Sequence, residues 1–334
     1  MMEAIRETNF DLPNQVDEVY RGKVGDVYTV EHQDSELLVV VRTDRISAYD
    51  VVLPEPVPYK GQVLNQISAE LLKDTAAVAP NWLLASPDPN VSIGYKAEPF
   101  KLEMIVRGYL LGSSWKAYSE YGARDICGNE LPDDMDEFDS FETPIVTPTT
   151  KATVGHDEAI TPAEVIEQGL ATEAEYDEME RLALNLFREG QLRAERRGLV
   201  MADAKYELGR LAASGLVVID EVHTPDAARY FPARELRQFS WGLSEMRPTQ
   251  LSKEFVREWL AEQGFTGQTC QTPPELPTAF IDSVTHRYVD LYESILDKPF
   301  EPAISDDPLG RIETNINNYL EEISGKSVAS LRVV

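Results

Sequence analysis

A regular alternation of charged and uncharged residues runs through residues 201–209, which read MADAKYELG, and it constrains the fold more than any other feature of the chain. Because side chains on a strand alternate with period two, the pattern predicts a strand with Asp203, Lys205 and Glu207 on one face. The residues between them would take the other face and pack inward. We therefore expect an antiparallel element with one charged side and one buried side.

The apolar run at 216–219 predicts a second strand, with residues 212–215 as the turn of a hairpin. This turn would set Glu207 roughly opposite Asp220. Two facing carboxylates repel each other, so the pairing requires a cation, and oxygen ligands that leave room for phosphates suit Mg²⁺. The alternative is a surface hairpin whose acids pair with Lys205 or Arg210. On this stretch alone both interpretations stay open.

The chain is strongly acidic: 58 acidic residues against 31 Lys and Arg give 334 residues a formal net charge of −27. Such a surface would repel nucleic acid and anionic membranes. No apolar run approaches the roughly 20 residues of a membrane span, and the N-terminus has no signal pattern, so we expect a cytoplasmic protein. The acids are spread along the chain, which favours a halophilic source over an ordinary acidic protein.

Strand and helix signals alternate along the chain and indicate an α+β fold. The predicted strands, besides the hairpin, are at 24–30, 37–42 and 101–106, and the predicted helices are at 61–73, 252–263 and 277–296. Thr161 and Thr172 each begin a capping box that opens a helix, and Gly198 ends the second one. Residues 128–143 are acidic and aperiodic, which predicts a surface loop. We place the domain boundary between residues 105 and 106.

Four further stretches carry residues suited to binding anions. Residues 20–28 (YRGKVGDVY) form a Gly-containing turn with one lysine, typical of a phosphate loop or of a plain hairpin turn. Residues 43–50 (TDRISAYD) offer an arginine that could hold a carboxylate, or an ordinary surface pair. Residues 106–118 (VRGYLLGSSWKAY) could open a helix whose amides hold an anion. Residues 147–161 (TPTTKATVGHDEAIT) predict an ordered loop that contributes one or two groups to a pocket.

Lys253 and Arg257 lie four residues apart, hence on one face of the predicted helix at 252–263. Like charges at that spacing repel each other, so an anion between them is one interpretation and a solvated helix face is the other.

Taken in order, these stretches, with DEVHTPDAARYF at 220–231 and SKEFVREWL at 252–260, resemble the SAICAR synthetase family of purine biosynthesis. The resemblance extends from about Tyr20 to Leu296. It implies an α+β fold in which an antiparallel N-terminal lobe (1–105), similar to a small kinase lobe, carries a glycine-rich nucleotide loop. A larger mixed ATP- and substrate-binding domain with C-terminal helices (106–334) follows, and ATP would lie between the two.

The activity implied by the resemblance is a carbon–nitrogen ligase reaction. It would join the ribotide CAIR (5-amino-1-(5-phosphoribosyl)imidazole-4-carboxylate) to L-aspartate, with MgATP cleaved to ADP and phosphate. The small-molecule substrates would be the partners, without nucleic acid or membrane. The sequence leaves the oligomeric state open, with a homo-oligomer as one outcome.

The resemblance also implies roles for single residues. The nucleotide would contact Gly22, Lys23, Val24 and Asp26, with Glu103 and Met104 as a hinge beside adenine. Mg²⁺ would be bound by Glu207 and Asp220. Asp203, Lys205 and Arg107 would act in catalysis at the CAIR carboxylate, with Ser113, Ser114, Arg229, Lys253 and Arg257 around CAIR. The last group matches family stretches near the substrate: Asp44, Arg45, Ser47, His156 and Asp157.

Some positions depart from the family pattern. Gly25 stands where the family commonly has Arg, which removes a cation from the nucleotide loop, and His223 stands where an apolar residue is usual. A phosphotransferase with the same MgATP cleft is the alternative activity, but it would need HRD- and DFG-type loops, and neither string occurs in the sequence. A binding protein without catalysis would be expected to lack residues such as Asp203 and Lys205.

Overall fold

The computed structural model describes residues 4–151, 157–212, 214–268 and 270–326. The chain forms two compact units. The first comprises Met1–Asp74, Trp82–Lys96 and Ser252–Val334, and the second comprises Thr75–Asn81 and Ala97–Leu251. The division differs from the predicted boundary after residue 105, because the strand that contains this position belongs wholly to the second unit and the C-terminal helices pack with the first.

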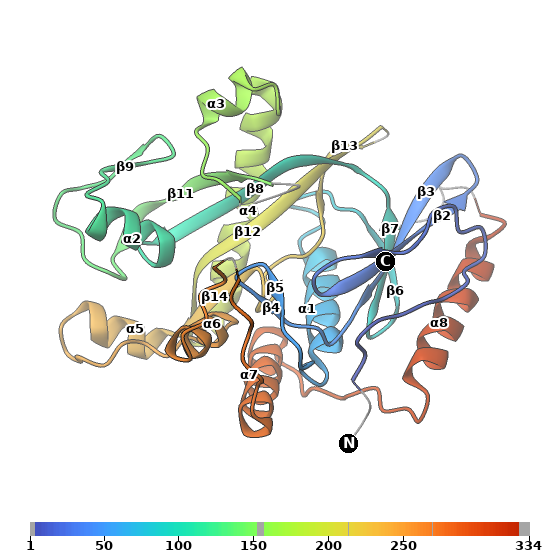
Figure 1. Cartoon of the computed structure of the whole chain (residues 1–334). Helices are drawn as coiled ribbons and strands as arrows, with labels where there is room; N and C mark the ends of the chain where they lie inside the picture. The colour runs from blue at the N-terminus through green and yellow to red at the C-terminus, as the bar shows by residue number, and fades with distance from the viewer. Residues whose placement is uncertain (1–3, 152–156, 213, 269, 327–334) are drawn as a thin grey trace. The chain divides into compact units, whose positions relative to one another are not determined.

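An antiparallel five-stranded sheet forms the centre of the first unit, with strand order β1-β2-β3-β7-β6 (Figure 1). Its strands are β1 (Tyr20–Arg21), β2 (Gly25–His32), β3 (Ser35–Arg42), β6 (Leu83–Asp88) and β7 (Val91–Tyr95). A separate two-stranded ribbon joins β4 (Ser47–Ala48) to β5 (Val51–Val52). The predicted strands at 24–30 and 37–42 are confirmed as β2 and β3, which are rich in the β-branched residues that favour strands.

Four helices belong to the first unit: α1 (Lys60–Asp74), α6 (Glu254–Glu262), α7 (Thr278–Leu296) and α8 (Pro308–Ile323). The first three confirm the predicted helices within two residues. The sequence analysis did not predict α8, which follows α7. Asp307 caps α8 and Pro308 begins it, and its apolar stripe packs on the sheet through Ile312, Ile316, Leu320 and Ile323.

The second unit is built on another antiparallel sheet, in which β12 is the longest strand. Its strands are β8 (Glu98–Tyr109), β11 (Ser140–Thr150), β12 (Leu199–Leu211), β13 (Gly215–Ile219) and β14 (Ala228–Pro232). One edge of β12 pairs with β8, while β14 and then β13 pair with its other edge. The predicted strand at 101–106 and the predicted hairpin are confirmed as β8, β12 and β13.

The predicted loop at 128–143 is partly regular structure. It contains β10 (Asn129–Glu130), which pairs with β9 (Asp125–Ile126), and the first residues of β11. The error has a local cause: β10 has two residues and only the first residues of β11 fall in this stretch, which is too short for an alternating strand pattern to be recognised.

The helices of the second unit are α2 (Gly112–Glu120), α3 (Pro162–Glu167), α4 (Glu173–Arg196) and α5 (Ala233–Ser240). Both predicted capping boxes are present, at Thr161 and Thr172. The long helix α4 packs against β8 and β12 and covers one face of the sheet (Figure 1). The other face of β12 therefore carries the charged side chains.

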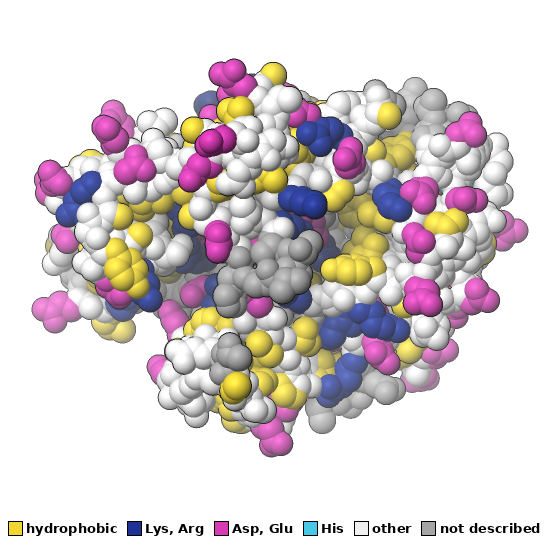
Figure 2. Space-filling view, turned by 45° about the horizontal axis from the view of Figure 1, so that its top comes forward, with side chains coloured by type: hydrophobic (Ala, Val, Ile, Leu, Met, Phe, Trp, Pro, Cys, Tyr) yellow, Lys and Arg dark blue, Asp and Glu magenta, His cyan; other side chains and the backbone are white. Residues whose placement is uncertain are grey.

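Acidic side chains are scattered over the face shown in Figure 2 rather than gathered in one patch. Among the described residues, no helix has the length and apolar character that a membrane span requires.

Candidate active site

The predicted charged face of β12 is confirmed by its pairing with β8. Asp203 lies opposite Arg107, and Glu207 lies opposite Glu103, with regular register between them. Lys205 is midway, so the three charged side chains of β12 project from the same face of the sheet. Tyr206 points to the opposite face, where its hydroxyl lies 2.7 Å from Nε2 of the buried His223.

The ammonium of Lys205 lies between two carboxylates. Its Nζ atom donates to Oε1 of Glu207 at 2.6 Å and to Oε1 of Glu103 at 3.0 Å. Lys151, directly after β11, forms an ion pair with the other oxygen of Glu207. We call these four residues the Lys205 cluster. Its charges balance: two ammonium groups face two carboxylates.

Burial by itself lowers the pKa of Lys205, but Glu207, Glu103 and Asp220 outweigh it and raise this pKa well above its ordinary value. Burial raises the pKa of Glu103, and Lys205 opposes that shift. Lys205 is therefore an ammonium at neutral pH. It can neutralise a carboxylate or a phosphate, but it cannot serve as a general base.

The hairpin register differs by one residue from the prediction. Glu207 lies opposite Ile219, not Asp220. Asp220 follows the last residue of β13 in a left-handed conformation, with φ of 62°, which ends the strand there. Its charge still acts on Lys205, so the carboxylate lies near the Lys205 cluster as the resemblance implied.

A second group of charges surrounds Asp203. Arg229 on β14 donates from Nε to both carboxylate oxygens, at 2.9 and 3.0 Å. Arg107 on β8 lies 3.6 Å from the same carboxylate, donates from Nε to the hydroxyl of Thr147 at 2.8 Å and contacts Ser113 at 3.3 Å. We call Asp203, Arg107 and Arg229 the Asp203 cluster. Two guanidinium groups face one carboxylate, so the cluster has an excess positive charge that suits an anionic ligand.

Helix α2 begins beside the Asp203 cluster. Gly112 has φ of +60°, and a Cβ at this position would lie 2.1 Å from Nη1 of Arg229. A larger residue would therefore strain the backbone and displace the guanidinium. Ser113 faces Arg107, whereas the buried hydroxyl of Ser114 donates to the carbonyl of Leu111 at 2.8 Å. Ser114 thus supports the turn before the helix, and its predicted contact with substrate has no support in this geometry.

In the first unit, the structure brings Ser47 together with the predicted basic pair. Nζ of Lys253 lies 3.5 Å from the Ser47 hydroxyl. The Tyr49 hydroxyl donates to the carbonyl of Arg257, whose guanidinium lies 5.9 Å from the centre of the tyrosine ring. Arg257 pairs with Glu254 at 3.0 Å, while its Nε is buried without a hydrogen-bond partner. A buried donor without a partner can still bind an anion.

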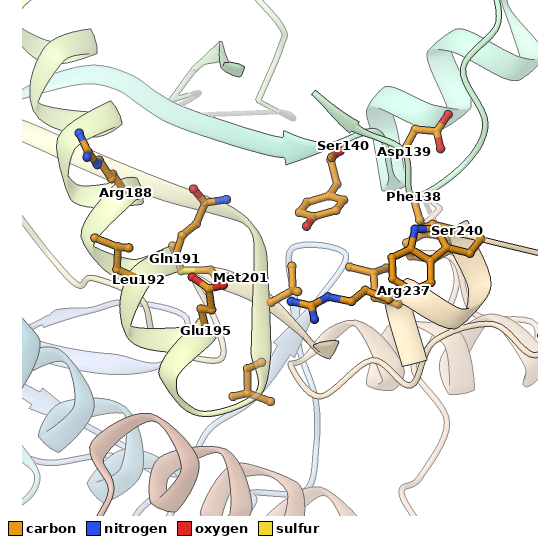
Figure 3. A pocket seen from close by; sticks show the side chains of 15 residues that line it. Phe138, Asp139, Ser140, Arg188, Gln191, Leu192, Glu195, Met201, Arg237 and Ser240 are labelled. Atoms are coloured by element: carbon orange, nitrogen blue, oxygen red, sulfur yellow. The ribbon is translucent and has the colours of Figure 1, made fainter. Parts of the chain in front are cut away.

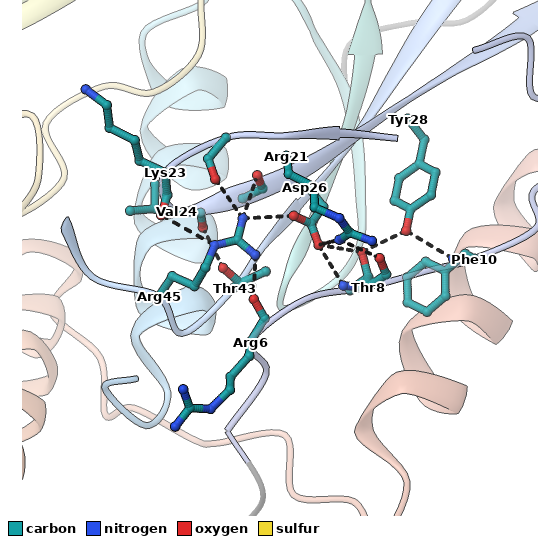
Figure 4. Close-up of polar contacts among 12 residues, drawn as sticks. Arg6, Thr8, Phe10, Arg21, Lys23, Val24, Asp26, Tyr28, Thr43 and Arg45 are labelled. Carbon is teal, nitrogen blue, oxygen red and sulfur yellow. Dashed lines mark hydrogen bonds and ion pairs between the residues drawn. The ribbon is translucent and has the colours of Figure 1, made fainter. Parts of the chain in front are cut away.

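The Gly-containing turn at 22–26 follows β1 and leads into β2. Lys23 is exposed and paired with Asp50. Asp26 is fully buried, and it accepts from Thr8 and from Arg21 and Arg45 (Figure 4). The prediction that Asp26 contacts nucleotide phosphates does not fit, because its oxygens already bind the protein and a carboxylate repels phosphate.

Two other predicted ligands have structural roles in the first unit. Asp44 is buried, and its carboxylate accepts from the amides of Ile5 and Gly61. Burial raises the pKa of Asp44 to about 6. Arg45 donates to backbone carbonyls at 22–25 and to Asp26. The guanidinium is therefore occupied and cannot hold a substrate carboxylate in the predicted way.

The predicted adenine hinge also lacks support. Glu103 and Met104 lie inside β8, which pairs with β11 on one side and with β12 on the other. Their backbone groups are used in the sheet, and the Met104 side chain is buried. Glu103 belongs instead to the Lys205 cluster. Asp157 is near enough to raise the pKa of Glu103, and His156 lies outside the described residues.

Sequence reasoning assigned no individual role to Lys151 or Thr147, although both lie in the TPTTKATVGHDEAIT stretch. Their partners, Glu207 and Arg107, are 56 and 40 residues away. The signal was present as one lysine among hydroxyl residues, but only the pairing of β11 with β8 shows which groups they meet.

A cavity of about 570 Å³ lies elsewhere in the second unit (Figure 3). Charges of both signs line it, and none of the predicted site residues does. Its lining residues are Tyr109, Phe138, Asp139, Ser140, Arg188, Gln191, Leu192, Glu195, Leu199, Val200, Met201, Leu236, Arg237, Ser240 and Trp241.

Comparison with known proteins places this geometry in a family. Residues 18–272 match the family model described as SAICAR synthetase. The phosphoribosylaminoimidazole-succinocarboxamide synthase of Bacteroides thetaiotaomicron is 48% identical over 323 residues, which cover 96% of this chain and 100% of the relative. The enzyme of the same name from Bacteroides fragilis is 49% identical over 321 residues, covering 96% and 99%.

Solved structures of similar proteins agree. A SAICAR synthase from Saccharomyces cerevisiae, complexed with SAICAR, is 28% identical with a TM-score of 0.73 and covers 90% of this chain and 100% of its own. A type-2 SAICAR synthetase in complex with ADP is 22% identical with a TM-score of 0.63, covering 85% and 100%, and shows a shared fold.

Proposed function

The chain belongs to the SAICAR synthetase family, and we propose that the charged face of β12 is where it performs the family's reaction. It is an ATP-dependent carbon–nitrogen ligase of purine biosynthesis. It condenses CAIR with L-aspartate to give SAICAR, ADP and phosphate. The first unit would contribute phosphate-binding groups of its own.

The observation that carries the assignment is the presence of two different charge clusters on one face of a single strand. Asp203 and Lys205 are two residues apart, which corresponds to about 7 Å along a strand. The Asp203 cluster has an excess positive charge and suits the carboxylate of CAIR. The Lys205 cluster is balanced and suits the meeting point of carboxylate and phosphate. Such spacing would hold the two reacting groups near each other.

Mg²⁺ fits at the edge of the Lys205 cluster, where Glu207 and the nearby Asp220 would bind it. Among the described residues, no group of three or more acidic, His or Cys side chains could hold a metal ion by itself. This agrees with the usual mode of Mg²⁺, which binds to one or two carboxylates and completes its shell with nucleotide phosphates and water. When bound, the ion would neutralise the phosphates and orient them for transfer.

The chemistry requires activation of the CAIR carboxylate, because a carboxylate is a poor electrophile and a poor acyl donor. Transfer of the terminal phosphate of ATP to the CAIR carboxylate leaves ADP, and attack by the aspartate amine then releases phosphate and one proton. Arg107 and Arg229 would orient the CAIR carboxylate. Lys205, held as an ammonium, would neutralise charge on the transferred group. Positioning and charge neutralisation suffice, without a nucleophilic side chain.

In the first unit, Gly22, Lys23 and Val24 would hold the nucleotide phosphates, and Ser47, Lys253 and Arg257 would hold the phosphate of the ribotide. The buried, unpartnered Nε of Arg257 supports the second role. The ADP and SAICAR named in the solved complexes of related proteins support the two ligand classes.

Further properties are proposed on charge and composition. The net charge of −27 supports a protein without nucleic-acid partners and a halophilic source. A cytoplasmic location agrees with purine biosynthesis, and a homo-oligomer remains a prediction. Phosphotransfer to a hydroxyl is not favoured, because the relatives are named as the synthetase.

Calorimetric titration with ADP at increasing Mg²⁺ concentrations tests the metal assignment. In the wild type, we expect Mg²⁺ to tighten ADP binding. In Asp220→Asn, the Mg²⁺ concentration that gives half of the tightening of ADP binding should be at least tenfold higher. The control Glu36→Gln, which alters an exposed ion pair with Lys96, should behave as the wild type. An unchanged Mg²⁺ dependence in Asp220→Asn would refute the metal role of this residue.

A further inference from the structure

The N-terminal segment 4–12, which we call the arm, packs against the rest of the first unit through several side chains. Ile5, Phe10 and Leu12 are buried in the core beside β2, β3 and α8. The Thr8 side chain is buried as well and faces Asp26. The arm is therefore part of the folded unit and can support the loop that Asp26 ends.

Asp26 joins this arm to the Gly-containing loop. Its Oδ2 accepts from the amide of Thr8 at 2.6 Å and from the Thr8 hydroxyl at 2.9 Å, while Oδ1 accepts from Nη2 of Arg45 at 2.8 Å. Arg21 donates to both Asp26 and the Thr8 carbonyl. Figure 4 shows these contacts as one connected network beneath the loop.

The guanidinium of Arg45 donates hydrogen bonds to carbonyl groups of the loop. Nη2 donates to Gly22 at 2.8 Å and to Gly25 at 3.0 Å, and Nε donates to Lys23 at 3.4 Å. Thr43 completes the set, since its amide and its hydroxyl each donate to the Val24 carbonyl at 3.0 Å. Three of these four carbonyls, those of Gly22, Lys23 and Gly25, thus meet the same guanidinium, and the Val24 carbonyl meets Thr43.

The direction of these carbonyls determines the direction of the amides. In a planar trans peptide, the N–H points away from the C=O of the same unit. Because the carbonyls of Gly22 and Lys23 face Arg45, the amides of Lys23 and Val24 face away from it. In the described part of the chain, neither amide has a hydrogen-bond partner. Successive free amides on one side of a turn form an anion-binding nest.

We infer that Arg45 is a positioning residue for the nucleotide: through the backbone carbonyls of the loop, it presents the amides of Lys23 and Val24 to the phosphates. Asp26 holds the guanidinium in place, and the arm holds Asp26. Gly25 supplies no cation to this loop, so the binding of phosphate depends on Lys23 and on the shape of the backbone. The inference rests on the proposed nucleotide role of the loop.

The test compares Arg45→Lys with Lys23→Ala by steady-state kinetics in which ATP, CAIR and aspartate are varied in turn. A lysine keeps the charge but cannot reach the same carbonyls, because it lacks the planar fork of arginine. We expect Arg45→Lys to raise KM for ATP about tenfold while KM for CAIR and for aspartate stays within twofold. Equal changes for all three substrates, or no change, would overturn the inference.

Lys23→Ala separates this inference from the assignment of the loop itself. If Lys23→Ala raises KM for ATP and Arg45→Lys does not, the loop binds nucleotide but Arg45 does not shape it. If Lys23→Ala leaves KM for ATP unchanged, the proposed nucleotide role of the loop fails.

A milder variant covers the case in which Arg45→Lys does not fold. Thr43→Val removes the hydroxyl that donates to the Val24 carbonyl. It keeps the hydrogen bond from the backbone N–H of residue 43 to the same carbonyl. We expect a rise of about threefold in KM for ATP, with a melting temperature within a few degrees of the wild type. A folded Thr43→Val protein with wild-type kinetics for ATP would contradict the inference.

Discussion

The glycine-rich loop of the first unit resembles the charged face of β12 in amino-acid content, since both combine acids, lysine and arginine within a few residues. Their structures differ in what those charges bind. Asp44 and Arg45 bind backbone groups, and Asp26 binds the Thr8 amide together with Arg21 and Arg45, so each of the three holds at least one backbone group in place. Asp203, Lys205 and Glu207 are bound to other charged side chains. A ligand can replace a charged side-chain partner more readily than a backbone partner, which is why we propose that the β12 face is the reactive one.

The largest effect is expected on activity at the β12 face. Glu207→Gln should lower kcat/KM by about 10³-fold, because it removes a proposed metal ligand and a partner of Lys205. The melting temperature should fall by only a few degrees, because Lys205 keeps Glu103 as a partner. Steady-state kinetics measures kcat/KM and thermal unfolding measures the melting temperature, with Glu36→Gln as a surface control. Turnover near that of the wild type would remove Glu207 from the site.

The opposite pattern is expected beneath the loop. Asp26→Asn should lower the free energy of unfolding by about 3 kcal/mol, because it leaves Arg45 partly buried without its carboxylate. Urea unfolding measures the change. If Asp26→Asn leaves the free energy of unfolding unchanged, the charge of Asp26 is not needed to hold the loop and the arm together.

A third effect depends on pH and concerns the side of β12 opposite the charged face. Burial, followed by the nearby Arg193, lowers the pKa of His223 to about 3 from 6.5. Between pH 6.5 and pH 3, His223 therefore binds a proton in the unfolded chain but not in the folded chain. The stability that comes from burying the neutral imidazole is fully present above pH 6.5 and is lost as the pH falls towards 3. In this range, the free energy of unfolding should change by about 1.4 kcal/mol per pH unit because of His223.

Chemical unfolding of the wild type and of His223→Leu between pH 7 and pH 5 isolates this contribution, since other groups cancel in the difference. The variant should show the shallower dependence on pH, whatever its stability at pH 7. Identical pH dependences would mean that His223 does not titrate with the low pKa assigned to it.

A smaller effect is expected at the proposed ribotide phosphate site. Arg257→Ala should weaken CAIR binding about tenfold and ATP binding much less, because only the ribotide is proposed to contact this arginine. Competition binding with both ligands measures the difference. Lys298→Ala, which removes an exposed pair with Glu70, serves as the control, and equal losses for both ligands in Arg257→Ala would argue against the phosphate role.

The smallest effect is expected from salt. With a net charge of −27, added KCl should screen self-repulsion and raise the melting temperature by a few degrees. A chain equally stable in dilute buffer and in concentrated salt would count against a halophilic source.

The features that the sequence predicted well are local ones. The capping boxes at Thr161 and Thr172 and the alternation along β12 depend on residues within a turn or a strand, and all three are confirmed. The hairpin register was off by one residue, because the backbone of Asp220 turns left-handed at the end of β13. A pattern of residue types does not show where a strand stops pairing.

The features that the sequence could not predict depend on distant partners. Asp26 and Asp44 seemed to be ligands because Thr8 and Ile5, which lie 18 and 39 residues away, gave no sign of meeting them. Glu103 was assigned to adenine through the family resemblance, and the sequence did not show that its neighbour on β12 is Glu207. Only tertiary pairing distinguishes a buried structural charge from an exchangeable one.

The most direct test of the account is the release of ADP by the purified protein when CAIR, aspartate and MgATP are omitted in turn. We predict release only when all three are present, with SAICAR formed in equal amount. ADP release without aspartate, or none with all three present across low and high salt, would contradict the assignment of ligase chemistry to this chain.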